Sequence, residues 1–186
     1  MKFGDFPVDQ AAGIILAHSQ RVGDKLLKKG IVLTESDTGA LTKAGVHSII
    51  GVRLGPDDYD ENAAAEKIAR VAGGKNIFIS TARTGRCNLL AATRGLVTVD
   101  ADRLNALNLV DETATLATLV PFVAVEKGDI IATAKIITFG VAKATIGKCE
   151  KIAKDGSPLV GIAPFIPKQI GLVQTVFPAH REQILD

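Results

Sequence analysis

The stretch that decides the fold runs from Thr84 to Lys135 and reads TGRCNLLAATRGLVTVDADRLNALNLVDETATLATLVPFVAVEKGDIIATAK. Hydroxyl, amide and charged side chains recur in it among apolar residues. Buried amides and hydroxyls need hydrogen-bond partners, which come either from the fold or from a ligand. The stretch is therefore the best candidate for a functional site, although it contains no standard catalytic motif.

The composition around this stretch indicates one large domain or two small ones in 186 residues. With no Trp, one Tyr and seven Phe, the core must be built from aliphatic side chains. Eighteen Gly indicate many tight turns and hence a strand-rich fold rather than a helical bundle. We expect an α+β, strand-rich, two-lobed region with short helices.

Charge and cysteine content restrict the partners. A net charge of +2 gives no electrostatic case for binding nucleic acid, and a basic groove with stacking aromatics is absent. The apolar runs are shorter than a membrane span, and the first seven residues do not form a secretory signal. Cys87 and Cys149 suggest no disulfide framework, although a single disulfide between them is kept as an alternative. We expect a reduced, cytoplasmic protein.

Before the stretch, the sequence predicts a strand, a hairpin, a helix and a further strand. Thr34 offers an N-cap with Asp37 three residues later, and Gly45 offers a C-terminal stop. Asp60 offers the cap of a second helix, which Gly73-Gly74 ends. The expected elements are strand 13–17, hairpin 21–33, helix 35–43, strand 47–54, helix 61–71 and a buried strand 76–81.

Within and after the stretch, we expect a helix capped by Asp100, two strands around the turn 126–129, a further helix and a last strand. Their ranges are 101–109, 122–125, 129–138, 141–153 and 159–163. Residues 169–176 (QIGLVQTV) read as a fresh buried strand after a Pro-rich linker. They are either an ordinary last strand with a frayed tail or the first strand of a truncated α/β domain in a longer chain, and we favour the second. The expected domains are 1–55, 56–163 and 164–186.

Five residues are the candidate ligand-binding residues. Arg86 and Asn88 share a face if they lie on a strand, and the turn before them could bind an anion. Thr113 and Thr115 also share a face, either as exposed hydroxyls on an edge strand or at a helix start, or as donors along a ligand cleft. Lys135 lies in an apolar strand and either extends from a sheet edge or meets a phosphate or carboxylate.

The cysteine, histidine and lysine side chains outside this set are interpreted as structural or solvent-exposed rather than as functional. Alternation places Cys87 opposite Arg86, which favours a buried, inert thiol. His18, His47 and His180 lack neighbours at metal-ligand spacing, so no metal site is expected. The basic run at Lys25, Lys28 and Lys29 reads as a solvated hairpin. No residue is expected to be catalytic, because no nucleophile–base pair is visible.

Three segments resemble the N-terminal region of bacterial molybdopterin-binding proteins of molybdenum cofactor biosynthesis, of the kind fused to a cytidylyl- or guanylyltransferase domain. They are MKFGDFPVDQAAGIILAHSQRVGDKLLKKGIVLTESDTGALTKAG (1–45), TGRCNLLAATRGLVTVDADRLNALNLVDETATLATL (84–119) and VEKGDIIATAKII (125–137). The resemblance does not fix which residues contact ligand.

The resemblance implies a region that binds or handles molybdopterin or the molybdenum cofactor, inactive alone, in a parent nucleotidyltransferase or molybdotransferase. Magnesium would bind only in the missing nucleotidyltransferase part. The implied partners are the pterin, a downstream domain of the same chain and a second copy in a homodimer, with neither nucleic acid nor membrane. The alternative function is a non-enzymatic scaffold or dimerisation domain without a small-molecule ligand. An independent enzyme of unrecognised chemistry is the least favoured reading.

Overall fold

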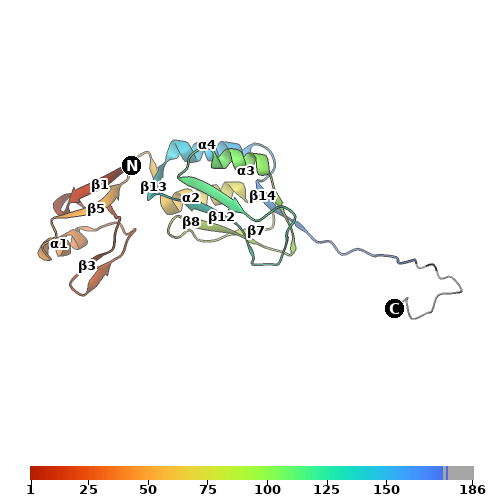
Figure 1. The fold of residues 1–186 in the computed structure, drawn as a ribbon, viewed down its shortest axis with the longest axis horizontal. Helices are drawn as coiled ribbons and strands as arrows, with labels where there is room; N and C mark the ends of the chain where they lie inside the picture. The colour runs from red at the N-terminus through yellow and green to blue at the C-terminus, as the bar shows by residue number, and fades with distance from the viewer. Residues whose placement is uncertain (174, 176–186) are drawn as a thin grey trace.

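A computed structural model of the chain describes residues 1–173 and 175, and in it the residues form two lobes with separate hydrophobic cores. The N-terminal lobe, red to orange in Figure 1, lies beside a larger central lobe. The N-terminal core is aliphatic apart from Phe6. The central core is built from Ala, Val, Ile, Leu and two Cys. The strand-rich α+β fold expected from the composition is confirmed.

The N-terminal lobe is a small antiparallel sheet with one helix. Its middle strand pairs on both sides, in the order β1-β5-β2. A separate hairpin and a 3-10 turn complete the lobe. The elements are β1 (Lys2–Pro7), η1 (Val8–Gln10), β2 (Ile15–Leu16), β3 (Gln20–Val22), β4 (Lys25–Leu27), α1 (Glu35–Lys43) and β5 (Ser48–Arg53).

Helix α1 begins as its sequence predicts. The Thr34 hydroxyl accepts a hydrogen bond from the Asp37 backbone N–H, and the Asp37 carboxylate accepts one from the Thr34 N–H. Lys25 of the hairpin donates to the same carboxylate at 2.7 Å. The Lys25 bond and then the Thr34 bonds lower the pKa of Asp37 from 3.8 to about 2. This carboxylate therefore joins the hairpin to the helix.

The central lobe contains two main sheets and three helices. One sheet has the order β10-β12-β8-β7 and the other the order β11-β9-β14, while β13 and β6 form a separate pair. The strands are β6 (Asp58–Asp60), β7 (Ile77–Ile79), β8 (Arg86–Ala91), β9 (Gly95–Val99), β10 (Ala114–Thr118), β11 (Ala124–Val125), β12 (Ile130–Ile136), β13 (Gly140–Ala142) and β14 (Val160–Pro164). The helices are α2 (Glu61–Ala72), α3 (Ala101–Asn108) and α4 (Lys143–Lys154).

Alternation along β8, and along β12 from Ala132 to Ile136, separates a core face from a polar face. Helix α2 packs on β8 and β12 and in turn contacts α4, so it lies between the sheet and α4 (Figure 1). Cys87 and Ala134 are fully buried on the core face. Arg86 and Lys135 project from the other face, where side chains are exposed or half-buried. An antiparallel sheet with one solvated face has this pattern.

Two expectations about strands differ from the structure, and the two strands expected around one turn form without pairing with each other. Residues 76–81 do not form a buried strand: β7 is a three-residue edge strand whose side chains stay half-buried or exposed. The strands on either side of turn 126–129 are not partners, because β11 pairs with β9 and β12 pairs with β8 and β10. Of the expected strand 169–176, residues 169–173 carry no strand, and residues 174 and 176 lie outside the described part.

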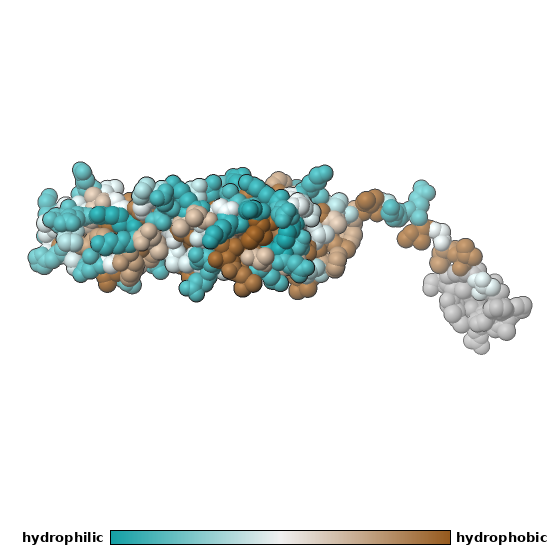
Figure 2. Space-filling view, turned by 90° about the horizontal axis from the view of Figure 1, so that it is seen from above, coloured by the Kyte–Doolittle hydropathy of each residue, from teal (hydrophilic) through white to brown (hydrophobic). Residues whose placement is uncertain are grey.

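The described C-terminal segment leaves the central lobe as an extended chain (Figure 1). Figure 2 shows brown, apolar groups along this segment. Its exposed apolar side chains are Phe165, Ile166, Ile170, Leu172 and Val173. In the part of the chain that the structure describes, no helix is both long and apolar enough to cross a membrane. The division into 1–55, 56–163 and 164–186 stays a prediction.

The depressed pKa of Asp37 predicts how the stability of the fold depends on pH. A carboxyl with a folded pKa below its unfolded pKa stabilises the fold above the unfolded value, and this contribution is lost as pH falls through 3.8 toward about 2. Asp37→Asn should lower the free energy of unfolding by about 1 kcal/mol near neutral pH, the typical value of a helix cap. Its deficit against the wild type should shrink at about pH 2.5.

Urea unfolding followed by circular dichroism at both pH values measures this deficit. The control is Asp24→Asn, because Asp24 is exposed in the hairpin turn. A deficit of Asp37→Asn that stays the same at low pH would contradict the role given to the Asp37 carboxylate.

Candidate functional site

A cavity of about 440 Å³ lies where the N-terminal lobe meets the central lobe, and we call it the interlobe cavity. Residues from the loop after β4, the start of α2, the turn before β8 and the end of β12 form its wall. They are Lys29, Gly30, Glu61, Thr84, Arg86, Lys135, Ile137, Thr138 and Phe139. Three cationic side chains and one carboxylate therefore meet in one concave site made from four segments.

The cationic wall is set by strand register. Lys135 of β12 pairs directly with Arg86 of β8 in the antiparallel ladder, so two positive side chains stand opposite each other on one face. Like charges in directly opposed positions destabilise a sheet. Lys135 Nζ donates to the Thr84 carbonyl at 2.7 Å, which leaves its charge without a carboxylate partner within 4 Å among the described residues. An anion between the two groups would remove the repulsion.

The turn before β8 holds this wall in place. Thr84 and Gly85 both have positive φ, at 48° and 67°. The Gly85 N–H donates to the Asn62 side chain at 2.9 Å, and the Gly85 carbonyl accepts from the Ile136 N–H at 2.8 Å. A Cβ at Gly85 would lie 2.8 Å from the Ile136 carbonyl oxygen, so the turn requires glycine. Helix α2 and strand β12 thus fix where Arg86 emerges.

Glu61 is the one carboxylate among the described residues that line the interlobe cavity. It is half-buried, and burial raises its pKa, an effect that the nearby Lys135 and Lys29 oppose. Its Oε2 and the Nζ of Lys135 both lie within about 3 Å of the point where a Gly85 Cβ would stand. Lys29 reaches the site from the other lobe, with its Nζ 5.5 Å from the centre of the Phe139 ring.

The structure brings together two of the five residues expected to contact ligand. Arg86 and Lys135 line the interlobe cavity, whereas Asn88, Thr113 and Thr115 do not. The side chains of these three are occupied by their own fold. Asn88 accepts from Thr133 at 2.9 Å, Thr113 donates to Asp111 at 2.7 Å, and Thr115 donates to the Lys135 carbonyl at 3.2 Å. Ligand contact by all five stays a prediction.

Lys29, Glu61 and Phe139 are the lining residues that sequence reasoning missed. Lys29 reads in the sequence as part of a solvated hairpin, and Glu61 as an ordinary first-turn residue of a helix. The three are far apart along the chain and occur in no common motif. Only the packing of the two lobes places them around one space, so the sequence carries no local signal for them.

The two cysteines are fully buried and unpaired. Burial is the largest influence on each thiol and raises the pKa of both Cys87 and Cys149. Cys87 Sγ donates to the Ser80 carbonyl at 3.2 Å. A thiol of this kind is a poor nucleophile, because the thiolate is the reactive form. The expectation that Cys87 is buried is confirmed, and its inertness stays a prediction.

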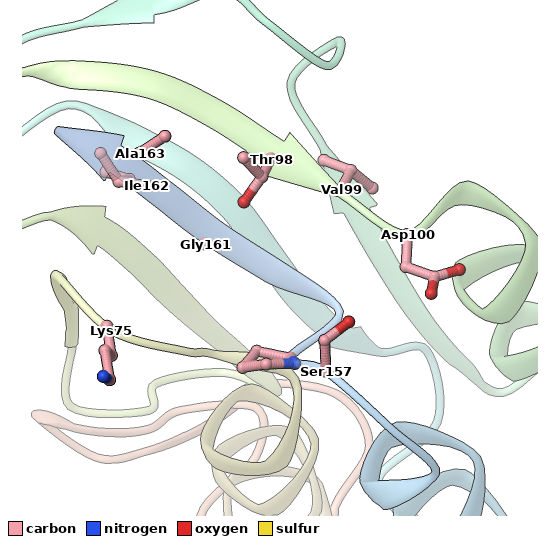
Figure 3. Close-up of a pocket in the computed structure, with 9 residues that line it drawn as sticks. Lys75, Thr98, Val99, Asp100, Ser157, Gly161, Ile162 and Ala163 are labelled. Atoms are coloured by element: carbon pink, nitrogen blue, oxygen red, sulfur yellow. The ribbon is translucent and has the colours of Figure 1, made fainter. Parts of the chain in front are cut away.

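A larger cavity of about 540 Å³ lies along β9 and β14, with Lys75, Thr98, Asp100 and Ser157 as its polar lining (Figure 3). Its polar groups are largely committed to the fold. In Figure 3 the Asp100 carboxylate turns toward α3, where it accepts from Arg103 N and Nε at 3.1 and 2.9 Å. The Ser157 carbonyl and hydroxyl both accept from Arg103. This cavity offers fewer unsatisfied groups to a ligand than the interlobe cavity.

Two family models match the chain. One, described as thiamine biosynthesis protein (ThiI), matches residues 66–162, which is more than half of the 186 residues. The other, described as a domain of unknown function (DUF8806), matches residues 5–53. Comparisons with curated proteins and with solved structures found no match. The first matched range contains Arg86 and Lys135, and the second contains Lys29.

The resemblance to molybdopterin-binding proteins is wrong. The match over 66–162 is to a thiamine biosynthesis family, and no molybdopterin-binding family was found. Molybdopterin or the molybdenum cofactor as ligand, the nucleotidyltransferase fusion with its magnesium, and the pterin partner are withdrawn with it. The scaffold alternative gains no support. The quoted segments combine short strands with the helices α1 and α3, and such combinations recur in unrelated α+β folds.

The turn at Gly85 predicts opposite effects for two Gly→Ala changes. Gly85→Ala should lower the free energy of unfolding by more than about 1 kcal/mol, because alanine is strained at this φ and its Cβ meets backbone. Gly147→Ala should raise it by about 0.5 kcal/mol, because Gly147 lies exposed within α4 with nothing near its Cβ position. Thermal and urea unfolding of both variants measure the pair. Equal effects would mean that the turn relaxes around a side chain.

Proposed function

This chain belongs to the thiamine biosynthesis protein (ThiI) family, and we propose that its interlobe cavity binds a small phosphate-bearing substrate of that biosynthesis. The observation that carries the proposal is the direct pairing of Arg86 with Lys135 across β8 and β12. A sheet that places two cations opposite each other is less stable than one with a neutral pair. A bound anion would offset this repulsion, and anion binding therefore accounts for the two cations in opposed positions.

Phosphate suits the cavity better than a single carboxylate does. Three cationic side chains, Lys29, Arg86 and Lys135, face one carboxylate, so the lining carries an excess of positive charge. Arg86 provides a planar fork of N–H donors, and the lysines provide compact charges, a combination typical of phosphate sites. The Gly85 N–H already donates to Asn62, so side chains rather than this backbone group would hold the anion.

The proposed role is binding rather than covalent catalysis. Burial raises the pKa of both thiols and so favours the unreactive protonated form, and Glu61 is the one acidic group among the described lining residues. The cavity therefore supplies orientation and charge for a reaction whose nucleophile comes from elsewhere. A cytoplasmic location belongs to the same proposal, because two free cysteines suit a reducing compartment.

Binding of inorganic phosphate and of pyrophosphate, measured by isothermal titration calorimetry at low salt, tests the proposal. Arg86→Ala and Lys135→Ala should each weaken binding by about 10- to 100-fold, since a hydrogen bond to a charged group contributes about 1.5–3 kcal/mol. Arg86→Lys should weaken it less, because the charge is kept and only the fork geometry is lost.

Lys151→Ala is the matched control, because Lys151 is an exposed lysine of α4 outside the cavity lining. It should bind phosphate like the wild type. Absence of binding to the wild-type protein, or equal affinity in the Arg86 and Lys135 variants, would overturn the proposed function.

A further inference from the structure

A second cavity, of about 360 Å³, adjoins the interlobe cavity. Both are lined by Gly30, Glu61 and Phe139, so they are two sectors of one cleft between the lobes. We call the sector with Arg86 and Lys135 the basic sector and the other the apolar sector. The remaining lining of the apolar sector is Gly13, Ile15, Val32, Leu54, Asp60 and Asn62.

The chemistry of the cleft changes between these sectors. The basic sector holds three cationic side chains, whereas the described lining of the apolar sector contains no Lys or Arg. The apolar sector has an aliphatic wall from the N-terminal lobe, where Val32 is 57% exposed. Phe139 stands at the junction and adds an aromatic surface to both sectors. A ligand that fills the whole cleft therefore has an anionic end in the basic sector, and its other end lies between aliphatic side chains and the carboxylates of Asp60 and Glu61.

The Glu61 carboxylate determines which chemical group a ligand can place in the apolar sector. Asp60 is already committed to capping α2, because its Oδ1 accepts from the Asn62 and Ala63 N–H groups at 2.9 Å. No hydrogen bond or ion pair to the Glu61 carboxylate occurs within residues 1–173 and 175. The half-buried group still reaches solvent, because no fully buried side-chain oxygen or nitrogen in this part of the chain lacks a partner. The carboxylate is therefore free to accept a charge-assisted hydrogen bond from a ligand in place of water.

We infer that the cleft recognises a phosphate ester of a ring that carries an amine or protonated nitrogen. Its phosphate lies among Lys29, Arg86 and Lys135, its ring lies against Phe139, and its N–H group donates to Glu61. This inference rests on the proposed function, since it takes the phosphate site as given and assigns the other end. Glu61 also rejects a ring with a second negative charge, because two carboxylates would then face each other in a partly desolvated site.

Three ring probes with matched phosphates separate these contributions: phenyl phosphate, 4-(aminomethyl)phenyl phosphate and 4-carboxyphenyl phosphate. Calorimetric titration of the wild-type protein should rank the aminomethyl probe tightest and the carboxy probe weakest. We expect about a tenfold gain of the aminomethyl probe over phenyl phosphate, the size of one charge-assisted hydrogen bond. Inorganic phosphate should bind more weakly than phenyl phosphate, because it makes no contact with Phe139.

Glu61→Gln should abolish the preference for the aminomethyl probe and leave the binding of inorganic phosphate equal or tighter. Glu112→Gln changes an exposed glutamate of the central lobe outside both sectors and should keep the full preference. Phe139→Leu should weaken both neutral and aminomethyl ring probes together, with circular dichroism confirming the fold.

The two proposals fail in different ways in this experiment. If inorganic phosphate does not bind, the proposed function fails, and the inference fails with it. If phosphate binds but the three ring probes bind equally, or if Glu61→Gln keeps the preference, the assignment of the second end is overturned while the phosphate site stands.

Discussion

The register between β8 and β12 is the constraint on which the rest of this structure depends. It places Cys87 opposite Ala134 in the core and Arg86 opposite Lys135 on the polar face. A slip by one residue would turn the apolar set toward solvent and the two cations toward α2. The burial of the core face against α2 therefore fixes the position of the cationic pair. The same strand register thus determines both the stability of the sheet and the geometry of the proposed binding site.

Helix α2 links this sheet to the cleft. Its middle residues are small and fully buried against the strands, while its first residues face the junction of the lobes. From that end Asn62 holds the Gly85 N–H and Glu61 stands beside Lys135. The same helix thus holds the turn before Arg86 through Asn62. It also supplies Glu61, the carboxylate that lines both the basic and the apolar sector.

Sequence reasoning succeeded where the signal is local. The capping box at Thr34 and Asp37, the cap at Asp60 and the cap at Asp100 all form, because each needs only residues three positions apart. It carries no information on strand partners: β11 and β12 flank one tight turn yet join different sheets. It failed for the family, because short strands and helices of this kind recur in many α+β folds and a likeness built on them is weak.

The sequence by itself determined the α+β class, the helix starts, the burial of Cys87 and the shared face of Arg86 and Asn88. These follow from alternation, capping and burial within single elements. Only the tertiary structure decided that Lys135 stands opposite Arg86, and that Lys29, Glu61 and Phe139 complete the site. The physical reason is that these residues come from separate elements, and their distances depend on strand pairing and on how the two lobes pack.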